Sequence, residues 1–165
     1  MPYKAVLTQA DIFAGINQRH IDRIASICKE KTFQRGETIF EENSTGDELY
    51  IIASGEVEIT VDPSLVSHRS DTPSEQRTIA HLRRGQSFGE IALVDQGIRS
   101  AAARSTSKDT QLIIIPRDEL LSLCEENPQL GYRLMRNLAA DLSMKLRGTD
   151  FQIRDQLLQQ RLSDD

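Results

Sequence analysis

The chain has 165 residues, a formal net charge of −5 and 38% hydrophobic residues, a composition typical of a globular protein with one packed core. The acidic balance argues against general nucleic-acid binding, which needs a clustered surplus of lysine and arginine. No apolar run approaches the roughly 20 residues that cross a bilayer, and the first residues lack the apolar segment of a signal peptide, so no membrane contact is expected.

The first thirty residues have helical periodicity. Asn17 can cap a helix in which apolar residues recur at Ile21, Ile24, Ala25 and Cys28. The charged run at 29–31 is expected to end this helix in solvent. Cys28 and the distant Cys124 both lie in helical apolar patterns, which predicts buried free thiols and a cytoplasmic protein.

From Thr32 the apolar period changes from 3.6 to 2, and glycine-containing turns separate short apolar segments. The polar, Pro- and Ser-containing stretch Asp62–Gln76 is interpreted as a mobile hairpin loop. Eight such segments indicate an antiparallel β-roll of the jelly-roll type. They are Thr32–Phe33, Thr38–Phe40, Leu49–Ala53, Glu56–Val61, Arg77–Leu82, Gln86–Phe88, Ala101–Ser105 and Thr110–Ile115.

After the last strand the helical period returns, so the predicted fold class is α+β. Pro116 begins one helix, and Asn127 with Pro128 begins another that runs to about Arg147. Gly148 is expected to break or bend it. Thr149 with Gln152 resembles a capping box for a further helix, Phe151–Leu162. We therefore predict one domain over residues 1–147 and a C-terminal helical extension over 148–165.

The segment 88–102 suits a small anion that carries a sugar. A short helical turn at 90–94 offers unpaired N–H groups, and Gly89 allows close backbone approach. Arg99 supplies a planar fork of donors that matches phosphate oxygens. Glu90 can accept a hydrogen bond from a ribose hydroxyl, as an acidic residue does in dinucleotide-binding folds. The competing interpretation is a surface ion pair between Glu90 and Arg99 beside a bulge glycine.

The same segment, FGEIALVDQGIRSAA, resembles the phosphate-binding cassette of the cyclic-nucleotide-binding domain family. The flanking segments GETIFEENSTGDELYIIASGEVEI and IIIPRDELLSLCEENPQL also resemble the strands and the helix of that family. The resemblance extends from roughly Leu7 to Arg147. It implies an eight-stranded roll flanked by N-terminal helices and closed by a C-terminal helical lid.

The resemblance also implies roles for individual residues. Glu90 would bind the ribose 2′-hydroxyl and Arg99 the cyclic phosphate. Gly89 would allow the backbone to approach the ligand closely. Ser100 follows the arginine, as in the catabolite activator type, so we expect cAMP in preference to cGMP. The remaining members of the cradle would be Ile91, Ala92 and Ala101, and base contacts would come from Leu142, Lys145, Leu146 and Thr149.

No catalytic set or metal-ligand spacing is visible around His20, His68 and His81, so we expect neither an enzyme nor a metal protein. About eighteen residues follow Arg147, too few for a helix-turn-helix domain, which predicts a stand-alone sensor that does not bind DNA. The alternatives are a roll that binds another ligand, such as cyclic di-GMP, and a structural interaction module without a ligand.

The last helices have two apolar stripes, and the roll can cover one of them. We expect one stripe to form a lid over the nucleotide and the other to contact a separate protein or a second copy. Gly148 would be the hinge between lid and extension. The first stripe is Leu142, Leu146, Ile153 and Leu157, and the second is Phe151, Leu158 and Leu162.

Overall fold

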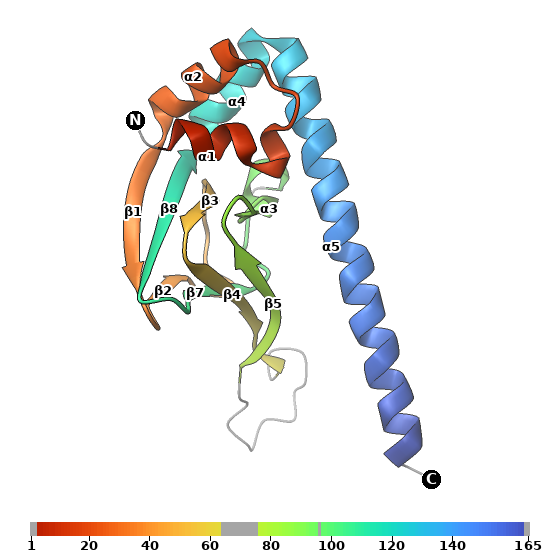
Figure 1. The fold of residues 1–165 in the computed structure, drawn as a ribbon. Coiled ribbons are helices and arrows are strands. Elements are labelled where there is room, and N and C mark those ends of the chain that lie inside the picture. The colour runs from red at the N-terminus through yellow and green to blue at the C-terminus, as the bar shows by residue number, and fades with distance from the viewer. Residues whose placement is uncertain (1–2, 64–75, 96, 164–165) are drawn as a thin grey trace.

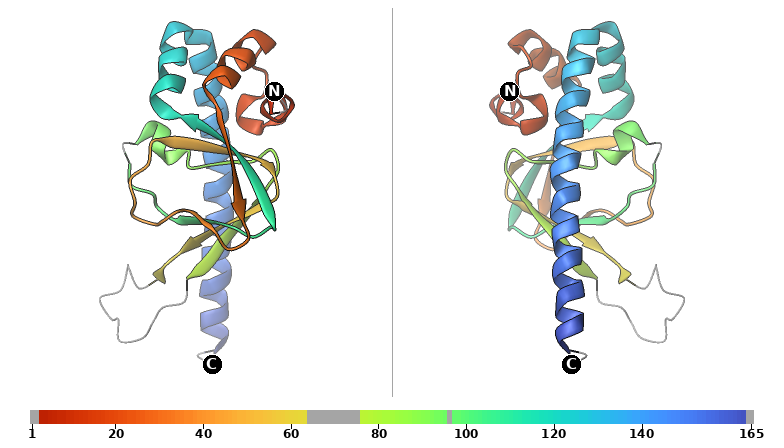
Figure 2. Two further views of the ribbon diagram at one scale, coloured as in Figure 1. Left: turned by 90° about the vertical axis from the view of Figure 1, so that its left-hand side faces the viewer. Right: turned by 90° about the vertical axis from the view of Figure 1, so that its right-hand side faces the viewer.

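The computed structural model describes residues 3–63, 76–95 and 97–163. Two short N-terminal helices, α1 (Lys4–Gln9) and α2 (Gln18–Ile27), lie with α4 (Arg117–Glu126) at one end of a β-roll (Figure 1). A 3₁₀ turn, η1 (Asp11–Phe13), joins α1 to α2. The long helix α5 (Pro128–Ser163) starts at that end, passes along the roll and continues beyond it (Figure 2).

Within the described residues, eight strands form two antiparallel sheets of four strands each, which confirms the predicted roll. One sheet has the order β1-β8-β3-β6, and the other has the order β2-β7-β4-β5. The strands are β1 (Lys29–Gln34), β2 (Thr38–Phe40), β3 (Glu48–Ser54), β4 (Glu56–Val61), β5 (Arg77–Arg83), β6 (Ser87–Phe88), β7 (Ala102–Ser105) and β8 (Asp109–Pro116). A short helix, α3 (Ile91–Val94), lies between β6 and β7.

The sheet that contains β3 and β8 is buried on both faces. In β3, Leu49 and Ile51 pack toward the helices, whereas Tyr50 and Ile52 point into the roll. Strand β8 alternates in the same way, with Ile113 opposite Ile51. Burial on both faces explains why these strands are continuous apolar runs without polar alternation. Each fully buried isoleucine or leucine contributes about 1.5–3 kcal/mol to folding.

Helix α2 is capped at its N-terminus as predicted, because Asn17 Oδ1 accepts a hydrogen bond from His20 N at 2.9 Å. The helix ends before the following charged run, and the side chains of residues 29–31 are exposed, as predicted. The predicted start of the strand at Thr32 is wrong, since residues 29–31 already begin β1 and pair with Leu112–Ile114 of β8. As β1 is an edge strand, its charged side chains remain in solvent while Phe33 packs into the roll. Cys28 directly follows α2 as its C-cap residue.

Helix α5 is continuous through Gly148, so the predicted break and the two separate helices are wrong. A glycine inside a helix costs only about 1 kcal/mol relative to alanine, which the surrounding helical sequence overcomes. Thr149 does not cap a new helix, because its hydroxyl donates to Lys145 O one turn earlier. Gln152 Nε2 donates to Ile79 O on β5.

Most of the predicted hairpin loop, including His68, lies outside the described residues. Both cysteines are free; Cys124 is buried and Cys28 is half-buried. Burial raises the pKa of the Cys28 thiol to about 12. None of the helices in the described part of the chain combines the length and apolarity of a membrane span.

Gly148→Ala is expected to stabilise α5 locally by up to about 1 kcal/mol. A Cβ there would have no neighbour within 4 Å among the described residues. Amide hydrogen exchange near residue 148 should therefore slow. The control is Gly131→Ala on the same helix, whose Cβ would lie 3.2 Å from Cys124 Cβ and O and offset the gain. Faster exchange in Gly148→Ala would contradict a continuous helix.

Candidate functional site

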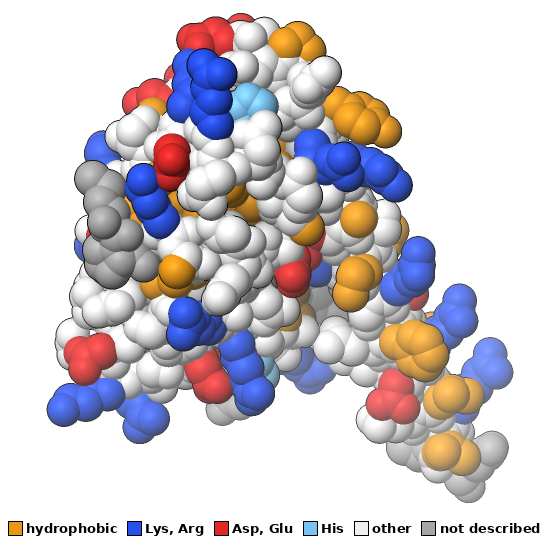
Figure 3. Space-filling view, turned by 45° about the horizontal axis from the view of Figure 1, so that its top comes forward, with side chains coloured by type: hydrophobic (Ala, Val, Ile, Leu, Met, Phe, Trp, Pro, Cys, Tyr) orange, Lys and Arg blue, Asp and Glu red, His pale blue; other side chains and the backbone are white. Residues whose placement is uncertain are grey.

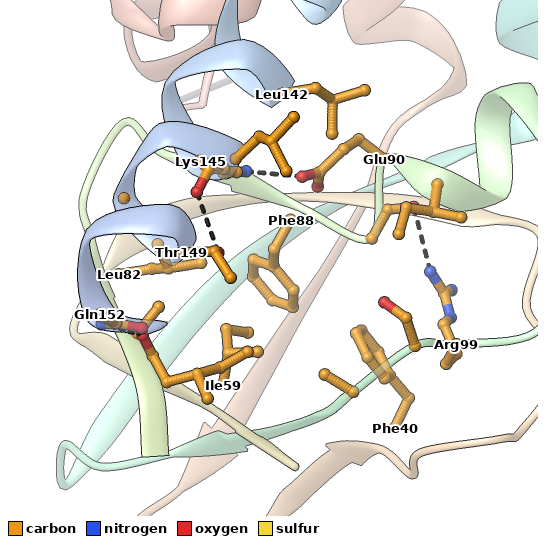
Figure 4. Close-up of a pocket in the computed structure, with 18 residues that line it drawn as sticks. Phe40, Ile59, Leu82, Phe88, Glu90, Arg99, Leu142, Lys145, Thr149 and Gln152 are labelled. Carbon is orange, nitrogen blue, oxygen red and sulfur yellow. Dashed lines mark hydrogen bonds and ion pairs between the residues drawn. The ribbon is translucent and has the colours of Figure 1, made fainter. Parts of the chain in front are cut away.

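A cavity of about 580 Å³ lies between the second sheet, the segment 88–101 and α5 (Figure 4). This volume is within the range of small-ligand sites. Figure 4 shows Glu90 and Arg99 on one side, and Ile59, Leu82 and Gln152 on the other. The strands contribute an apolar wall of Phe40, Ile59, Ile79, Ala80, Leu82 and Phe88.

Nine of the ten residues predicted for the site line this cavity. They are Gly89, Glu90, Ile91, Arg99, Ser100, Ala101, Leu142, Lys145 and Thr149. The exception is Ala92, whose side chain is buried in α3. Leu146 also lines the cavity, as expected. Sequence reasoning missed the apolar wall and Gln152. The apolar alternation in β4 predicted one inward-facing side of the strand. It could not show that this side lines a cavity.

The segment between β6 and β7 is held by backbone contacts with residues 43–46. Arg99 N donates to Ser44 O at 2.8 Å, and Asn43 N donates to Arg99 O at 2.8 Å. Gly46 N donates to Gly97 O at 3.3 Å. Gly46 must lack a side chain, because a Cβ there would overlap the guanidinium of Arg99. Two loops distant in sequence therefore fix the position of the arginine.

Arg99 is only 5% exposed. Its Nη1 donates to Gly89 O and its Nη2 to Glu48 O, each at 3.1 Å. The guanidinium carbon lies 4.3 Å from the centre of the Phe40 ring, a cation–π arrangement. Arg99 makes no ion pair among the described residues, and its Nε is buried without a hydrogen-bond partner there. A buried cation with an unused N–H favours an anionic ligand.

Glu90 is 7% exposed and stands at the start of α3. Its Oε1 accepts a hydrogen bond from Lys145 Nζ of α5 at 2.7 Å. The alternative of a surface ion pair between Glu90 and Arg99 is wrong, since both are buried and have different partners. Glu90 and Arg99 thus present an acceptor and a donor group to one cavity.

Two histidines singled out from the sequence, His20 and His81, lie on different elements and do not line the cavity. His81 lies on β5 opposite Glu58, and His20 lies in α2. Within residues 3–63, 76–95 and 97–163, no group of three His, Cys, Asp or Glu side chains could hold a metal ion.

A family model described as the cyclic nucleotide-binding domain matches residues 30–127, which is more than half of the chain and includes the entire segment between β6 and β7. The chain belongs to the cyclic nucleotide-binding domain family. The resemblance of the sequence to this family and the predicted roll are thereby confirmed.

Two curated members of this family are similar in sequence. The cyclic AMP receptor protein of Thermus thermophilus is 32% identical over 86% of this chain and 60% of its own length. A CRP-like cAMP-activated global transcriptional regulator of Mycobacterium tuberculosis is 30% identical over 83% of this chain and 57% of its own length. The chain therefore spans about 60% of the length of these relatives.

Among solved structures, the catabolite activator protein of Thermus thermophilus superposes with a TM-score of 0.70. It is 31% identical, and the match covers 88% of this chain and 62% of that one. The cyclic nucleotide-binding domain of the present chain therefore has the same fold.

Gly89→Ala should destabilise the domain more than Gly36→Ala does. Both glycines have a positive φ, at +77° and +82°, so alanine costs about 1–2 kcal/mol at either position. A Cβ at Gly36 has no neighbour within 4 Å among the described residues. A Cβ at Gly89 would lie 2.6 Å from Arg99 Nη1 and 3.1 Å from Glu48 O, adding about 1–3 kcal/mol. Urea unfolding measures both; equal losses would contradict the packing around Arg99.

Proposed function

We propose that this cyclic nucleotide-binding domain is a receptor for a cyclic mononucleotide and binds cAMP in preference to cGMP. The observation that supports it is the buried guanidinium of Arg99, without an ion pair among the described residues, which lines the same cavity as Glu90. Arg99 would hold the cyclic phosphate with help from Ser100 and the backbone at Ala101. Glu90 would accept the ribose 2′-hydroxyl.

The preference for cAMP rests on the relatives and on the far side of the cavity. Both curated relatives are named for cAMP. Gln152 Nε2 donates to Ile79 O, which leaves Gln152 Oε1 as an acceptor. An acceptor there would suit the 6-amino group of adenine and not the 6-oxo group of guanine. Leu142, Leu146 and Thr149 would complete the contacts to the base.

Cyclic di-GMP is a weaker candidate, because it carries two phosphates and would need a second free cation. Lys145 lines the cavity, but its ammonium group already contacts Glu90. We also propose that the domain does not turn over its ligand and acts in the cytoplasm as a sensor. Its output would be protein contact in preference to DNA contact, consistent with the net charge of −5.

We place the output on α5, with residues 148–165 as the extension of a domain at 1–147. Leu142 and Leu146 of the first stripe line the cavity, as a lid requires. The second stripe is exposed, with Phe151 at 76% and Leu162 at 79%, and Leu146, Ile153 and Leu157 of the first stripe are exposed as well. Figure 3 shows apolar side chains along the part of α5 that extends beyond the roll. Large apolar side chains in one row on a surface indicate a contact site. We propose a second copy of the chain as its occupant, with a separate protein as the alternative.

Arg99→Ala should weaken cAMP binding by about 3 kcal/mol, on the order of 100-fold. Glu90→Ala should cost less, because it removes one hydrogen bond. Calorimetry with cAMP, cGMP and cyclic di-GMP measures each affinity, and chromatography of the recovered cAMP tests that it stays intact. The matched control is Arg104→Ala, since Arg104 pairs with Glu58 and does not line the cavity. Undiminished cAMP affinity in Arg99→Ala would overturn the assignment.

A double substitution of Phe151 and Leu158 with serine should convert a self-associated chain to monomers, because it removes the apolar contact of the second stripe. The control replaces Ile153 and Leu157 with serine, two apolar residues on another face of the same helix. Light scattering during gel filtration gives the mass of each variant. A wild-type chain that is monomeric at high micromolar concentration would exclude the second copy and leave a separate protein as the occupant.

A further inference from the structure

Lys145 connects α5 to the carboxylate that faces the cavity. Its Nζ donates to Glu90 Oε1 at 2.7 Å and to Ser87 O at 2.9 Å, and lies 2.8 Å from Asp141 Oδ2. Two of the three N–H donors of the ammonium group are used on Glu90 and Ser87, whereas Asp141 Oδ2 is an ion-pair contact without a hydrogen bond among the described residues. Figure 4 shows the Lys145 ammonium group in contact with Glu90.

Glu90 depends on this contact. A buried carboxylate is costly unless it is paired and hydrogen-bonded. Among the described residues, Lys145 is the one cation paired with Glu90. Glu90 belongs to the segment between β6 and β7, and Ser87 O, which Lys145 also contacts, is on β6. Lys145 thus joins the carboxylate and the adjoining strand.

The contact leaves Glu90 able to bind a ligand. Lys145 contacts Oε1, and a carboxylate accepts hydrogen bonds on both oxygens. The second oxygen, Oε2, can therefore accept from a hydroxyl group while Lys145 stays in place. The ammonium group orients the carboxylate and offsets its charge next to an anionic ligand.

We propose that Lys145 is the positioning residue for Glu90, so that recognition of the ribose 2′-hydroxyl depends on α5 being seated on the roll. This inference rests on the proposed function, in which Glu90 accepts that hydroxyl. Within the described residues, two side chains of α5 hydrogen-bond to the strands: Lys145, and Gln152 two turns later. The hydroxyl and the helix therefore share one carboxylate, and each stabilises the geometry that the other needs.

The test compares cAMP with 2′-deoxy-cAMP, which lacks only the hydroxyl. The wild-type chain should bind cAMP at least about tenfold more tightly than the deoxy ligand, as expected for a hydrogen bond to a charged group. In Lys145→Met this ratio should fall below about threefold, chiefly through weaker binding of cAMP. In Glu90→Gln the ratio should also fall, and adding Lys145→Met should then lower it little further, because the two residues act as one unit.

The matched control is Arg147→Met, which removes one positive charge from the same helix. Arg147 is exposed and makes no ion pair in the described part of the chain, so the ratio should be unchanged. An undiminished ratio in Lys145→Met would overturn the inference. Tighter cAMP binding in that variant would also overturn it, because Lys145 would then compete with the ligand.

Amide hydrogen exchange of α5 in the ligand-free protein tests the role of Lys145 independently of the proposed function. Lys145→Met should speed exchange over residues 142–152 relative to Arg147→Met, because α5 loses its connection to Glu90 and Ser87. Equal exchange in the two variants would contradict the role of Lys145 even if cAMP binds. A wild-type chain that binds no cyclic nucleotide would refute the proposed function, while the exchange comparison would still test the contact.

Discussion

The buried guanidinium of Arg99 constrains every segment around it. Its Nη1 and Nη2 donate to the carbonyls of Gly89, directly after β6, and Glu48, the first residue of β3. Its face lies on Phe40, and neither Gly46 nor Gly89 could carry a Cβ without displacing it. The arginine therefore holds the segment between β6 and β7 in place through neutral carbonyls, and its positive charge has no ion-pair partner among the described residues. Under the proposed function, a site organised in this way would lose little conformational entropy on binding.

The sheet buried on both faces connects this site to the helices. Tyr50 of β3 lies in the inner core, where its ring centre is 5.5 Å from the Arg99 guanidinium. Its neighbours Leu49 and Ile51 belong to the core shared with α2, α4 and the first turns of α5. Adjacent residues of one strand therefore contact both regions. Because close-packed interiors transmit strain, a change around Arg99 has a short path to the base of α5.

The features that depend on local patterns could be predicted from the sequence. The strands followed from apolar alternation or from short apolar runs between glycine-containing turns, the Asn17 cap from its position, and Glu90 and Arg99 from one contiguous motif. The features that depend on tertiary contact could not. The charged start of β1 was misassigned because pairing with β8, and not side-chain character, determines that strand. The Lys145–Glu90 contact joins residues 55 positions apart, and no local pattern encodes it.

The first turns of α5 are fixed to the rest of the molecule, and the remainder of the helix extends from them as an arm. A Cβ at Gly131 would approach Cys124 of α4 to 3.2 Å, Leu138 is buried, and Asn137 Nδ2 donates to Ile12 O and Ala14 O. At a rise of 1.5 Å per residue, Lys145 lies about 10 Å along the helix from Leu138 and Ser163 about 38 Å. Because the helix is continuous through Gly148, a sideways shift of about 1 Å at Lys145 would become about 3–4 Å at the far end. The length of α5 thus amplifies displacement away from the roll.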